Sequence, residues 1–438
     1  MQKRRLRQPL LLAAIAIAIA IAVAMVVAAC GTSTQTLGQS PTAPASAAAS
    51  AAASAGPSSR PSPESDQAVY ARIESQVEAV RQLQRTSTVT PVLLDSAGVR
   101  DWLTKANAAQ TNHVALANET KLFVHLGLLP AGSDLEQMEL DLQAGQVVGF
   151  YDPESKGLYV LSDSGGVGPV EKMTFSHEYT HALQDQVFGL DKLAIDAPDQ
   201  GDRDFARTAL VEGDATLAMA LWSTKNMSLP DLLAVVGDSS SAAQTDQLAK
   251  APTILRESLM FPYLDGLAFV QSIYDMGGWA AVDQLYANPP DSTSQILHPD
   301  LYTKKVKPVA VSVPAVPVSL GSGWELTMQD TLGELQLRIW LEGENPSSAA
   351  TTAAASATSA WAGDRVALYE GPNGAWAVVL KTTWRSAAGA QAFGTQADKI
   401  LRGLPNPSRI CTGLSNGSIV IASDQTVIPQ LEDCSSTK

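Results

Sequence analysis

The chain has 438 residues, and its 30 Lys and Arg residues against 44 Asp and Glu residues give a formal net charge of −14 at pH 7. So large an excess of acid argues against binding of nucleic acid and against electrostatic docking on anionic lipid. The part of the chain that follows residue 65 is too long for one ordinary domain, which predicts two domains.

The first 65 residues have the composition of a targeting segment followed by a tether. Basic residues within positions 3–7 precede an apolar run at 9–29 that ends in two alanines and Cys30. This pattern resembles a bacterial lipobox, so residues 1–30 are expected to be a signal peptide whose Cys30 carries a lipid. The alternative is an uncleaved membrane helix, and either anchor places the rest of the chain at the outer face of the cytoplasmic membrane. Residues 31–65, rich in Ala, Ser and Pro, are expected to be a disordered tether.

Between residues 66 and 161 the spacing of apolar residues alternates between helical and strand-like patterns. Apolar residues three or four positions apart predict helices at 66–85, at 96–105 and, twice, within 111–144. Branched and aromatic residues predict strands at 88–94, 147–151 and 158–161. The last two strands are joined by a turn, which predicts a hairpin.

A pentapeptide of the form H-E-x-x-H, His177-Glu178-Tyr179-Thr180-His181, follows in a segment with helical spacing that begins near Pro169. Positions four apart lie on one face of a helix, so both imidazoles can bind the same metal ion. Glu178 lies about 100° round the helix from His177, which places its carboxylate beside the metal rather than on it. The motif can also arise by chance on a polar helix, but this chain has only five histidines.

A catalytic zinc ion takes three protein ligands and keeps its fourth position for water. The best third candidate is Glu212, a carboxylate framed by small residues in a helical segment that runs from Phe205 through Trp222. Gly213 inside that helix indicates a close approach to another helix, and we expect that neighbour to be the helix with the histidines. The alternative is that Glu212 is a surface acid and that another acid, such as Asp214, binds the metal.

Together, the H-E-x-x-H motif and the downstream Glu212 resemble the gluzincin group of zinc metallopeptidases. Four wider stretches are similar to a family of bacterial extracytoplasmic metallopeptidases, a resemblance that covers roughly residues 66–305; they are residues 148–153, 177–186, 210–215 and 292–302. The resemblance implies an α+β fold with a mainly helical, zincin-like catalytic domain that carries a small sheet and the active-site helix. It also implies one Zn²⁺ per chain on His177, His181 and Glu212, with Glu178 as the general base.

The same resemblance implies a donor that stabilises the oxyanion and an edge strand that pairs with an extended substrate. Candidate donors are Tyr263 and His298, although Tyr263 can also be a core aromatic and His298 a loop cap. The hairpin that begins at 147–151 supplies the candidate edge strand. Asp185, four residues past His181, can orient that imidazole or can be a solvated acid at the end of the helix.

An acid-rich segment follows the motif helix. Its acids match no calcium-loop spacing, so we expect a solvated loop; they are Asp191, Asp196, Asp199, Asp202 and Asp204.

The pattern of residues changes in the last third of the chain. A helix at 255–286 is expected to break at Gly277-Gly278. Alternating Pro and Val then predict an extended connector, so the catalytic domain is assigned to 66–305, the connector to 306–319, and a smaller α+β domain of unknown role to 320–438. Its expected elements are strands at 364–370, 375–381 and 419–422 and helices within 326–340 and at 386–401.

Two cysteines are left once Cys30 is assigned to the lipid. Cys411 and Cys434 can form a disulfide in an oxidising compartment, or they can be two free thiols.

These expectations describe a membrane-tethered, extracytoplasmic zinc endopeptidase that works as a monomer on protein or peptide substrates and has no nucleic-acid partner. Two alternatives stay open. One is a non-catalytic binding or scaffold lipoprotein whose zinc is structural, although a structural site has no use for a base at Glu178. The other is a metal-dependent hydrolase of a non-peptide substrate, for example the amide bonds of the cell wall.

Overall fold

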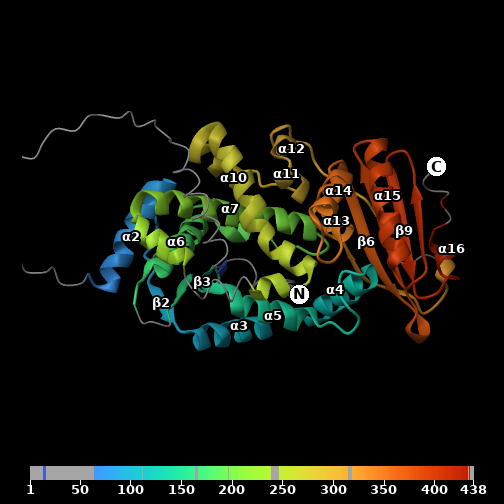
Figure 1. The fold of residues 1–438 in the computed structure, drawn as a ribbon, viewed down its shortest axis with the longest axis horizontal. Helices are drawn as coiled ribbons and strands as arrows, with labels where there is room; N and C mark the ends of the chain where they lie inside the picture. Colours follow the sequence, from blue (N-terminus) through green and yellow to red (C-terminus); the bar gives the residue numbers. More distant parts are fainter. Residues whose placement is uncertain are drawn as a thin grey trace, which may run out of the picture.

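The structure, a computed structural model, describes residues 13–15, 64–110, 112–162, 166–195, 197–237, 246–313, 318–432 and 434. Within these ranges the protein has an α+β fold, in which a mainly helical part precedes a part built on a five-stranded sheet (Figure 1). The expected signal peptide, Cys30 and the tether lie outside the described residues, apart from positions 13–15, 64 and 65. Among the described residues, no helix is both long enough and apolar enough to cross a membrane.

The helical part contains all the residues of the expected metal site. Its helices are α2 (Asp66–Arg81), α3 (Ser96–Gln110), α4 (His113–Leu126), α5 (Leu135–Gln146), α6 (Pro169–Phe188), α7 (Gly201–Asn226), α8 (Leu229–Val236), α10 (Thr253–Ala287), α11 (Thr293–Leu297) and α12 (Pro299–Thr303). A small sheet lies beside them with the strand order β1-β3-β4-β2. Its strands are β1 (Ala13–Ile15), β2 (Pro91–Leu94), β3 (Val147–Asp152) and β4 (Gly157–Leu161). The expected hairpin is present, since β3 and β4 pair antiparallel.

The ends of α6 follow from local chemistry. Pro169 lies in the first turn, where its missing N–H costs no helical hydrogen bond, and Gly189 ends the helix with a φ of 74°. Between these ends, Met173, Phe175 and Leu183 are completely buried because α6 packs against α2, α7 and the hairpin strands. The H-E-x-x-H pentapeptide therefore lies in the middle of an internal helix.

Helices α7 and α10 touch through their backbones. A Cβ atom on Gly213 of α7 would lie 2.3 Å from the carbonyl oxygen of Gly266 in α10, and a Cβ on Gly266 would lie 2.3 Å from the carbonyl oxygen of Ala209. The close approach expected at Gly213 is thus present, but the neighbour is α10 and not the histidine-bearing α6. As the sequence predicted, α10 is interrupted by non-helical backbone at Gly277 and Gly278.

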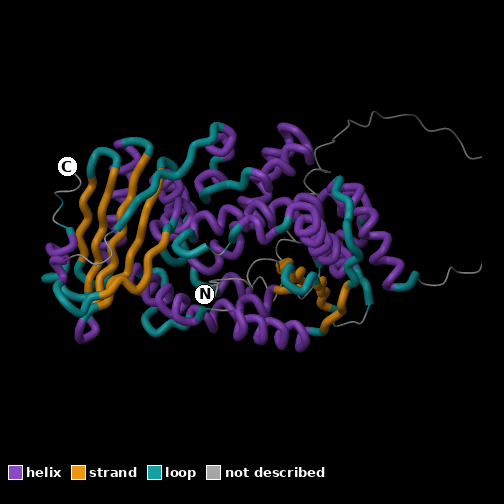
Figure 2. The backbone as a smooth tube through the Cα atoms, turned by 180° about the vertical axis from the view of Figure 1, so that it is seen from behind, coloured by secondary structure: helices purple, strands orange, loops and turns teal. Residues whose placement is uncertain are grey.

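The C-terminal part is an antiparallel sheet with the order β5-β6-β7-β9-β8, covered by helices. Its elements are β5 (Glu325–Asp330), α13 (Gly333–Glu342), α14 (Ser348–Thr358), β6 (Trp361–Glu370), β7 (Trp376–Trp384), α15 (Ala387–Gly403), β8 (Ser408–Thr412), β9 (Asn416–Ala422) and α16 (Ile428–Leu431). Figure 2 shows this sheet and the small sheet of the helical part at separate places in the molecule. Cys411 of β8 forms the disulfide with Cys434 that the sequence allowed.

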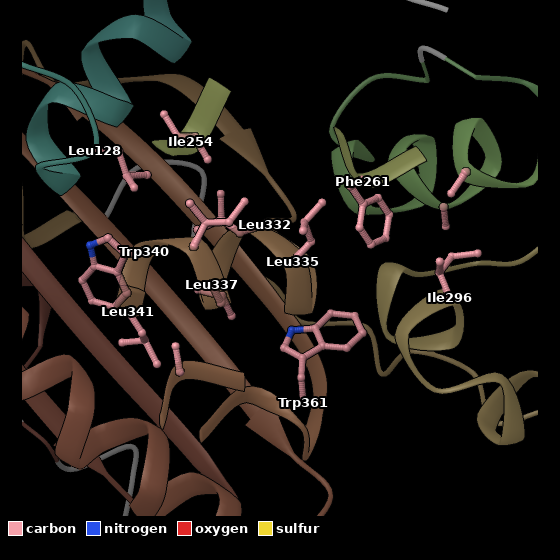
Figure 3. Packing of buried hydrophobic residues seen from close by; sticks show 14 of the residues in the cluster. Leu128, Ile254, Phe261, Ile296, Leu332, Leu335, Leu337, Trp340, Leu341 and Trp361 are labelled. Carbon is pink, nitrogen blue, oxygen red and sulfur yellow. The ribbon is translucent and has the colours of Figure 1, made fainter. Parts of the chain in front are cut away.

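One apolar cluster joins the two parts. It contains residues of α4, α7 and α10 together with residues of α13, β6, β7 and α15. Figure 3 shows how Leu128, Ile254 and Phe261 of the helical part approach Leu335 and Trp340 of the C-terminal part. The indole Nε1 of Trp340 also donates a hydrogen bond to the backbone oxygen of Leu126 at 2.9 Å. The chain therefore builds one continuous core across the expected connector.

A buried acid of the helical part lies at this junction. Asp202, which the sequence placed in a solvated loop, is instead the second residue of α7 and only 2% exposed. Its carboxylate accepts hydrogen bonds from the backbone N–H and the hydroxyl of Thr293. Gly333 packs directly against it, because a Cβ atom there would lie 1.8 Å from the Asp202 Oδ1 atom.

Candidate metal centre

Helix α6 carries both histidines of the motif into the interior. His177, Glu178 and His181 are each 0% exposed. The two imidazole rings lie edge to face, with their centroids 4.7 Å apart. Their Nε2 atoms are separated by 3.1 Å, so both rings direct the same nitrogen at one point. The helical spacing of the motif therefore gives the convergence that was expected from it.

Glu212 of α7 completes the group. Its Oε2 atom lies 3.1 Å from Nε2 of His177 and 3.3 Å from Nε2 of His181. A tetrahedral zinc site with bonds of about 2.0–2.1 Å has ligand atoms about 3.3 Å apart. The three atoms thus lie at nearly the separations that a metal ion requires, and these residues form a buried group that could hold one.

The three side chains are coupled electrostatically, and a metal ion would have to displace the proton that the raised pKa of His181 favours. Burial lowers the pKa of His177. Burial alone would raise the pKa of Glu212, but the two histidines lower it, so its carboxylate stays ionised. Burial alone would lower the pKa of His181, as it does for His177. The carboxylates of Glu212 and Glu178 and two hydrogen bonds instead raise the pKa of His181 to about 9. Two imidazoles and a carboxylate are a donor set that zinc accepts.

Gln184 fixes the orientation of His181. Its amide nitrogen donates to the backbone oxygen of Val211 at 3.0 Å and to Oδ2 of Asp214 at 3.1 Å. Its Oε1 atom is then the acceptor for Nδ1–H of His181, at 2.8 Å. With the proton on Nδ1, the lone pair of Nε2 faces Glu212 and His177, as metal binding requires.

The contact to His181 that the sequence allowed for Asp185 belongs to Gln184 instead. The Asp185 carboxylate accepts hydrogen bonds from the Tyr151 hydroxyl at 2.8 Å and from Lys156 Nζ at 2.6 Å. Both donors come from the β3–β4 hairpin, so Asp185 ties the hairpin to α6. The physical reason is that two cationic or hydroxyl donors on that side of the helix outcompete one imidazole N–H for the carboxylate.

A buried ion pair fixes Asp214, which accepts a hydrogen bond from Gln184. Arg81, the last residue of α2, places Nε 2.6 Å from Oδ1 and Nη2 3.0 Å from Oδ2 of Asp214. The Tyr286 hydroxyl also donates to Oδ2 of Asp214, at 2.7 Å. The Arg81 guanidinium lies 4.3 Å from the ring centroid of Trp279. Removing one member of such a pair costs about 3–5 kcal/mol because the other charge stays buried.

Strand β3 runs past the proposed base. A Cβ atom on Gly149 of β3 would lie 2.5 Å from Cγ2 of Thr174 and 3.5 Å from Cγ of Glu178. The strand therefore needs glycine here in order to lie directly on α6. One edge of β3 pairs with β4. The other edge pairs antiparallel with Ala13–Ile15, and Ala14 faces Gly149. The edge of β3 that does not pair with β4 is thus paired with an extended segment of chain at Gly149.

The two candidate oxyanion donors lie in different surroundings. The ring centroid of Tyr263, in α10, is 6.3 Å from that of His177. Burial, the charges of Glu212 and Glu178, and a hydrogen bond to Glu212 raise the pKa of Tyr263 well above its usual range. His298 lies between α11 and α12, where its Nε2 atom is 2.8 Å from Oε1 of Glu334 in α13. Its role as a donor stays a prediction.

The sequence did not predict the supporting roles of three residues at this site, one of which, Asp214, it named only as an alternative ligand. Gln184 and Asp214 lie within the stretches 177–186 and 210–215, where their positions beside the ligands were the available signal. Arg81 has no such signal, since it is 133 residues away from its partner Asp214.

Comparison with known proteins gives little beyond this geometry. A family described as a domain of unknown function (DUF8575) matches residues 324–426, which span β5 to β9 of the C-terminal part. No curated protein matches the chain. A crystal structure from Chloroflexus aurantiacus, described as "a putative hydrolase with a novel fold", is similar over 54% of this chain and 88% of its own, with 16% identity and a TM-score of 0.35. Similarity at that level assigns neither fold nor activity.

Proposed function

We propose that the protein is a zinc-dependent peptidase. The observation that carries the proposal is the buried convergence of His177, His181 and Glu212, with Glu178 on the same helix as the two histidines. A structural zinc site is normally closed by four protein ligands, whereas a catalytic site has three. In the described part of the chain the group has three members, which favours catalysis over the scaffold alternative.

Glu178 is the residue that handles the proton. When bound, zinc polarises the scissile carbonyl and lowers the pKa of a water molecule. Glu178 lies one position after the ligand His177 and is buried against β3, so its carboxylate can take the proton of the attacking water and return it to the leaving amine. A general base in this role contributes roughly 10²–10⁴ to the rate.

Tyr263 is the better placed of the two oxyanion donors. Its ring packs near His177 and its hydroxyl reaches Glu212, whereas the ring of His298 is bonded to Glu334. We therefore assign the stabilisation of the oxyanion to the Tyr263 hydroxyl, which stays protonated in this environment.

The edge of β3 gives the proposed substrate its orientation. An extended peptide that pairs with this edge runs past Gly149 and therefore past Glu178. The antiparallel pairing of Ala13–Ile15 at the same edge supports this mode of binding. Backbone pairing of this kind recognises a peptide irrespective of most of its side chains.

We also propose, from the sequence pattern alone, that the protein is anchored through a lipid on Cys30 at the outer face of the cytoplasmic membrane. Loss of the protein from the membrane fraction on a Cys30→Ala change is the expected result, and unchanged partition would contradict the lipid anchor.

The metal content and the activity test the function together. The purified protein is expected to contain about one zinc per chain by elemental mass spectrometry, and a His181→Ala variant is expected to contain almost none. Chelation should abolish the hydrolysis of an unstructured protein such as casein, and added Zn²⁺ should restore it.

A matched variant distinguishes this enzyme from a contaminant. Glu178→Gln should keep the zinc, because Glu178 is not a ligand, but should lose hydrolysis by roughly 10²–10⁴. Equal hydrolysis by the wild type and Glu178→Gln would show that the activity is not that of this site. Absence of zinc in both, after refilling with metal, would remove the enzyme proposal.

A further inference from the structure

A cavity of about 590 Å³ lies between the helical part and the C-terminal part. Its walls come from α4, α5, α7 and α10 on one side and from β5 and α13 on the other. The segment 197–200, which leads into α7, closes another side. Contacts from β5 hold this segment, since Asp330 Oδ1 accepts from the backbone N–H of Gly201 at 2.8 Å and Gln329 donates to Asp199 Oδ2 at 2.9 Å.

The cavity lies close to the metal centre. Tyr263, which packs near His177, is one of its lining residues. Thr208 also lines it and lies four residues before Glu212 on α7, which is one helical turn of about 5.4 Å. A substrate side chain next to a bond held at the metal centre can therefore extend into this space.

The lining is acidic around an apolar wall. Among the lining residues there are five carboxylates and no Lys, Arg or His; the acids are Glu119, Glu139, Asp199, Asp204 and Asp330. All five are half-buried. Two basic side chains approach these residues from outside the lining: Arg203 places Nε 3.9 Å from Oδ1 of Asp204, and Arg365 donates to the backbone oxygen of Asp199 at 2.7 Å.

Apolar side chains of the same wall would contact the stem of a bound group; they are Leu142, Phe205, Leu255, Leu259 and Met328. Ser258 is a further lining residue of this wall. An apolar wall with acids beyond it fits a long aliphatic stem that ends in a cation, as in lysine and arginine.

We propose that this cavity is the subsite that receives a lysine or arginine side chain of the peptide substrate, and that β5 of the C-terminal part forms one of its walls. The proposal rests on the peptidase function proposed above and adds the class of substrate to it. It also gives the C-terminal part a role in selecting substrates.

The test uses two double variants, each of which removes two negative charges, one from α5 and one from β5. Glu139→Gln/Asp330→Asn removes two acids of the cavity, one from α5 and one from β5. Asp141→Asn/Glu325→Gln removes two exposed acids from α5 and β5 that do not line it. The probes are fluorogenic peptides in which Lys, Leu or Glu occupies in turn each position beside the cleaved bond.

The wild type is expected to prefer lysine at one of these positions. For that peptide kcat/KM should fall about tenfold in Glu139→Gln/Asp330→Asn, whereas the leucine peptide should change less than about twofold. The control variant should match the wild type with every peptide. Cleavage without preference for lysine, or equal losses in the two double variants, would overturn the subsite while the peptidase function stands.

A binding measurement separates the two proposals. In the Glu178→Gln background, fluorescence anisotropy should show tighter binding of the lysine peptide than of the leucine peptide, and the cavity variant should remove the difference. This result without any cleavage by the wild type would support the subsite and contradict the peptidase function, and equal binding would overturn the subsite. If Glu139→Gln/Asp330→Asn does not fold, Glu119→Gln/Glu139→Gln replaces it, with the same expected results.

Discussion

Gln184 connects the metal site to the buried polar groups behind it. Its oxygen accepts from His181, and its nitrogen donates to Asp214 and to the backbone of Val211. Because Asp214 is fixed by Arg81, the rotamer of the imidazole depends on a chain of contacts that ends at α2. Groups that orient a metal-binding histidine in this way strengthen metal binding without touching the metal.

Replacement of Gln184 by alanine is expected to lower zinc affinity by about 10–100-fold, because His181 then loses the acceptor that sets its tautomer. Competition with a fluorescent chelator measures the affinity. The control is Gln186→Ala on the same helix, whose side chain contacts the backbone of Thr86 and Ser87 and which should leave the affinity unchanged. An unchanged affinity in a folded Gln184→Ala protein would show that the contact does not position the ligand.

The ligands were predictable from the sequence, but their supports were not. His177, Glu178 and His181 are fixed relative to each other by the helix itself, so spacing alone places them. Asp185 and Gln184 are both near His181 along the chain, and the sequence indicated a role for Asp185, as an orienting group or as a solvated acid, but none for Gln184. Which of the two side chains contacts His181 depends on where Asp214 and the hairpin donors lie, and that is a property of the tertiary structure.

At the scale of elements, the contact between α7 and α10 sets the position of Glu212. Gly213, the next residue, lies against the backbone of Gly266. An alanine at Gly213 would push the helices apart, and overpacking of this kind costs about 1–3 kcal/mol. We therefore expect Gly213→Ala to lower both the free energy of unfolding in urea and the zinc affinity.

The matched change is Gly403→Ala at the end of α15, where a Cβ atom would have no neighbour within 4 Å. That variant should be as stable as the wild type or slightly more stable. Equal stability of the two alanine variants would mean that α7 and α10 can separate without cost.

Elements with a strong pattern were predicted well. The motif helix, the β3–β4 hairpin and the break in α10 follow from apolar spacing, turn residues and paired glycines. The elements that were missed lack such signals. Helix α14 is composed mainly of Ala, Ser and Thr and has no stripe of large apolar residues, although Ala354 and Ala357 are buried against neighbours. Strand β5 overlaps the range in which the sequence predicted a helix, and it pairs with β6, which is distant in sequence.

At the scale of the whole molecule, the junction between the two parts contains a buried acid. Burial, together with the charges of Asp364 and Glu334 and against the hydrogen bonds from Thr293, raises the pKa of Asp202 from 3.8 to about 8. Between these values the folded protein holds a proton that the unfolded chain has released. The stability contributed by this group is therefore complete below about pH 4 and is lost as the pH rises towards 8.

Asp202→Asn removes this titration and can keep the acceptor oxygen that faces Thr293. Relative to the wild type, its free energy of unfolding should rise by at least about 1 kcal/mol between pH 5 and pH 8, since one unit of pKa shift corresponds to about 1.4 kcal/mol. Urea titrations at the two pH values measure the change, with the exposed acid Asp246 replaced by Asn as a control. If the free energy of unfolding changed equally in the wild type and in Asp202→Asn between the two pH values, the raised pKa of Asp202 would be contradicted.

The shared core predicts that the described part of the protein unfolds as one unit. Leu335, Trp340 and Trp361 of the C-terminal part belong to the same cluster as Phe261 and Ile254 of the helical part, so neither part can lose its structure without exposing the apolar surface of the other. Calorimetry should show a single transition. Trp340→Ala should lower its midpoint through a loss of about 3–5 kcal/mol, and two separate transitions would show that the parts are independent.

The cavity between the two parts has a consequence for how this protein can diverge. The groups proposed to break the bond lie on α6, α7 and α10, whereas one wall of the space beside them belongs to β5. Substitutions in β5 can therefore alter what is accepted without disturbing the ligands or the base. A lineage of such proteins can acquire new targets through its C-terminal sheet while it inherits its chemistry unchanged.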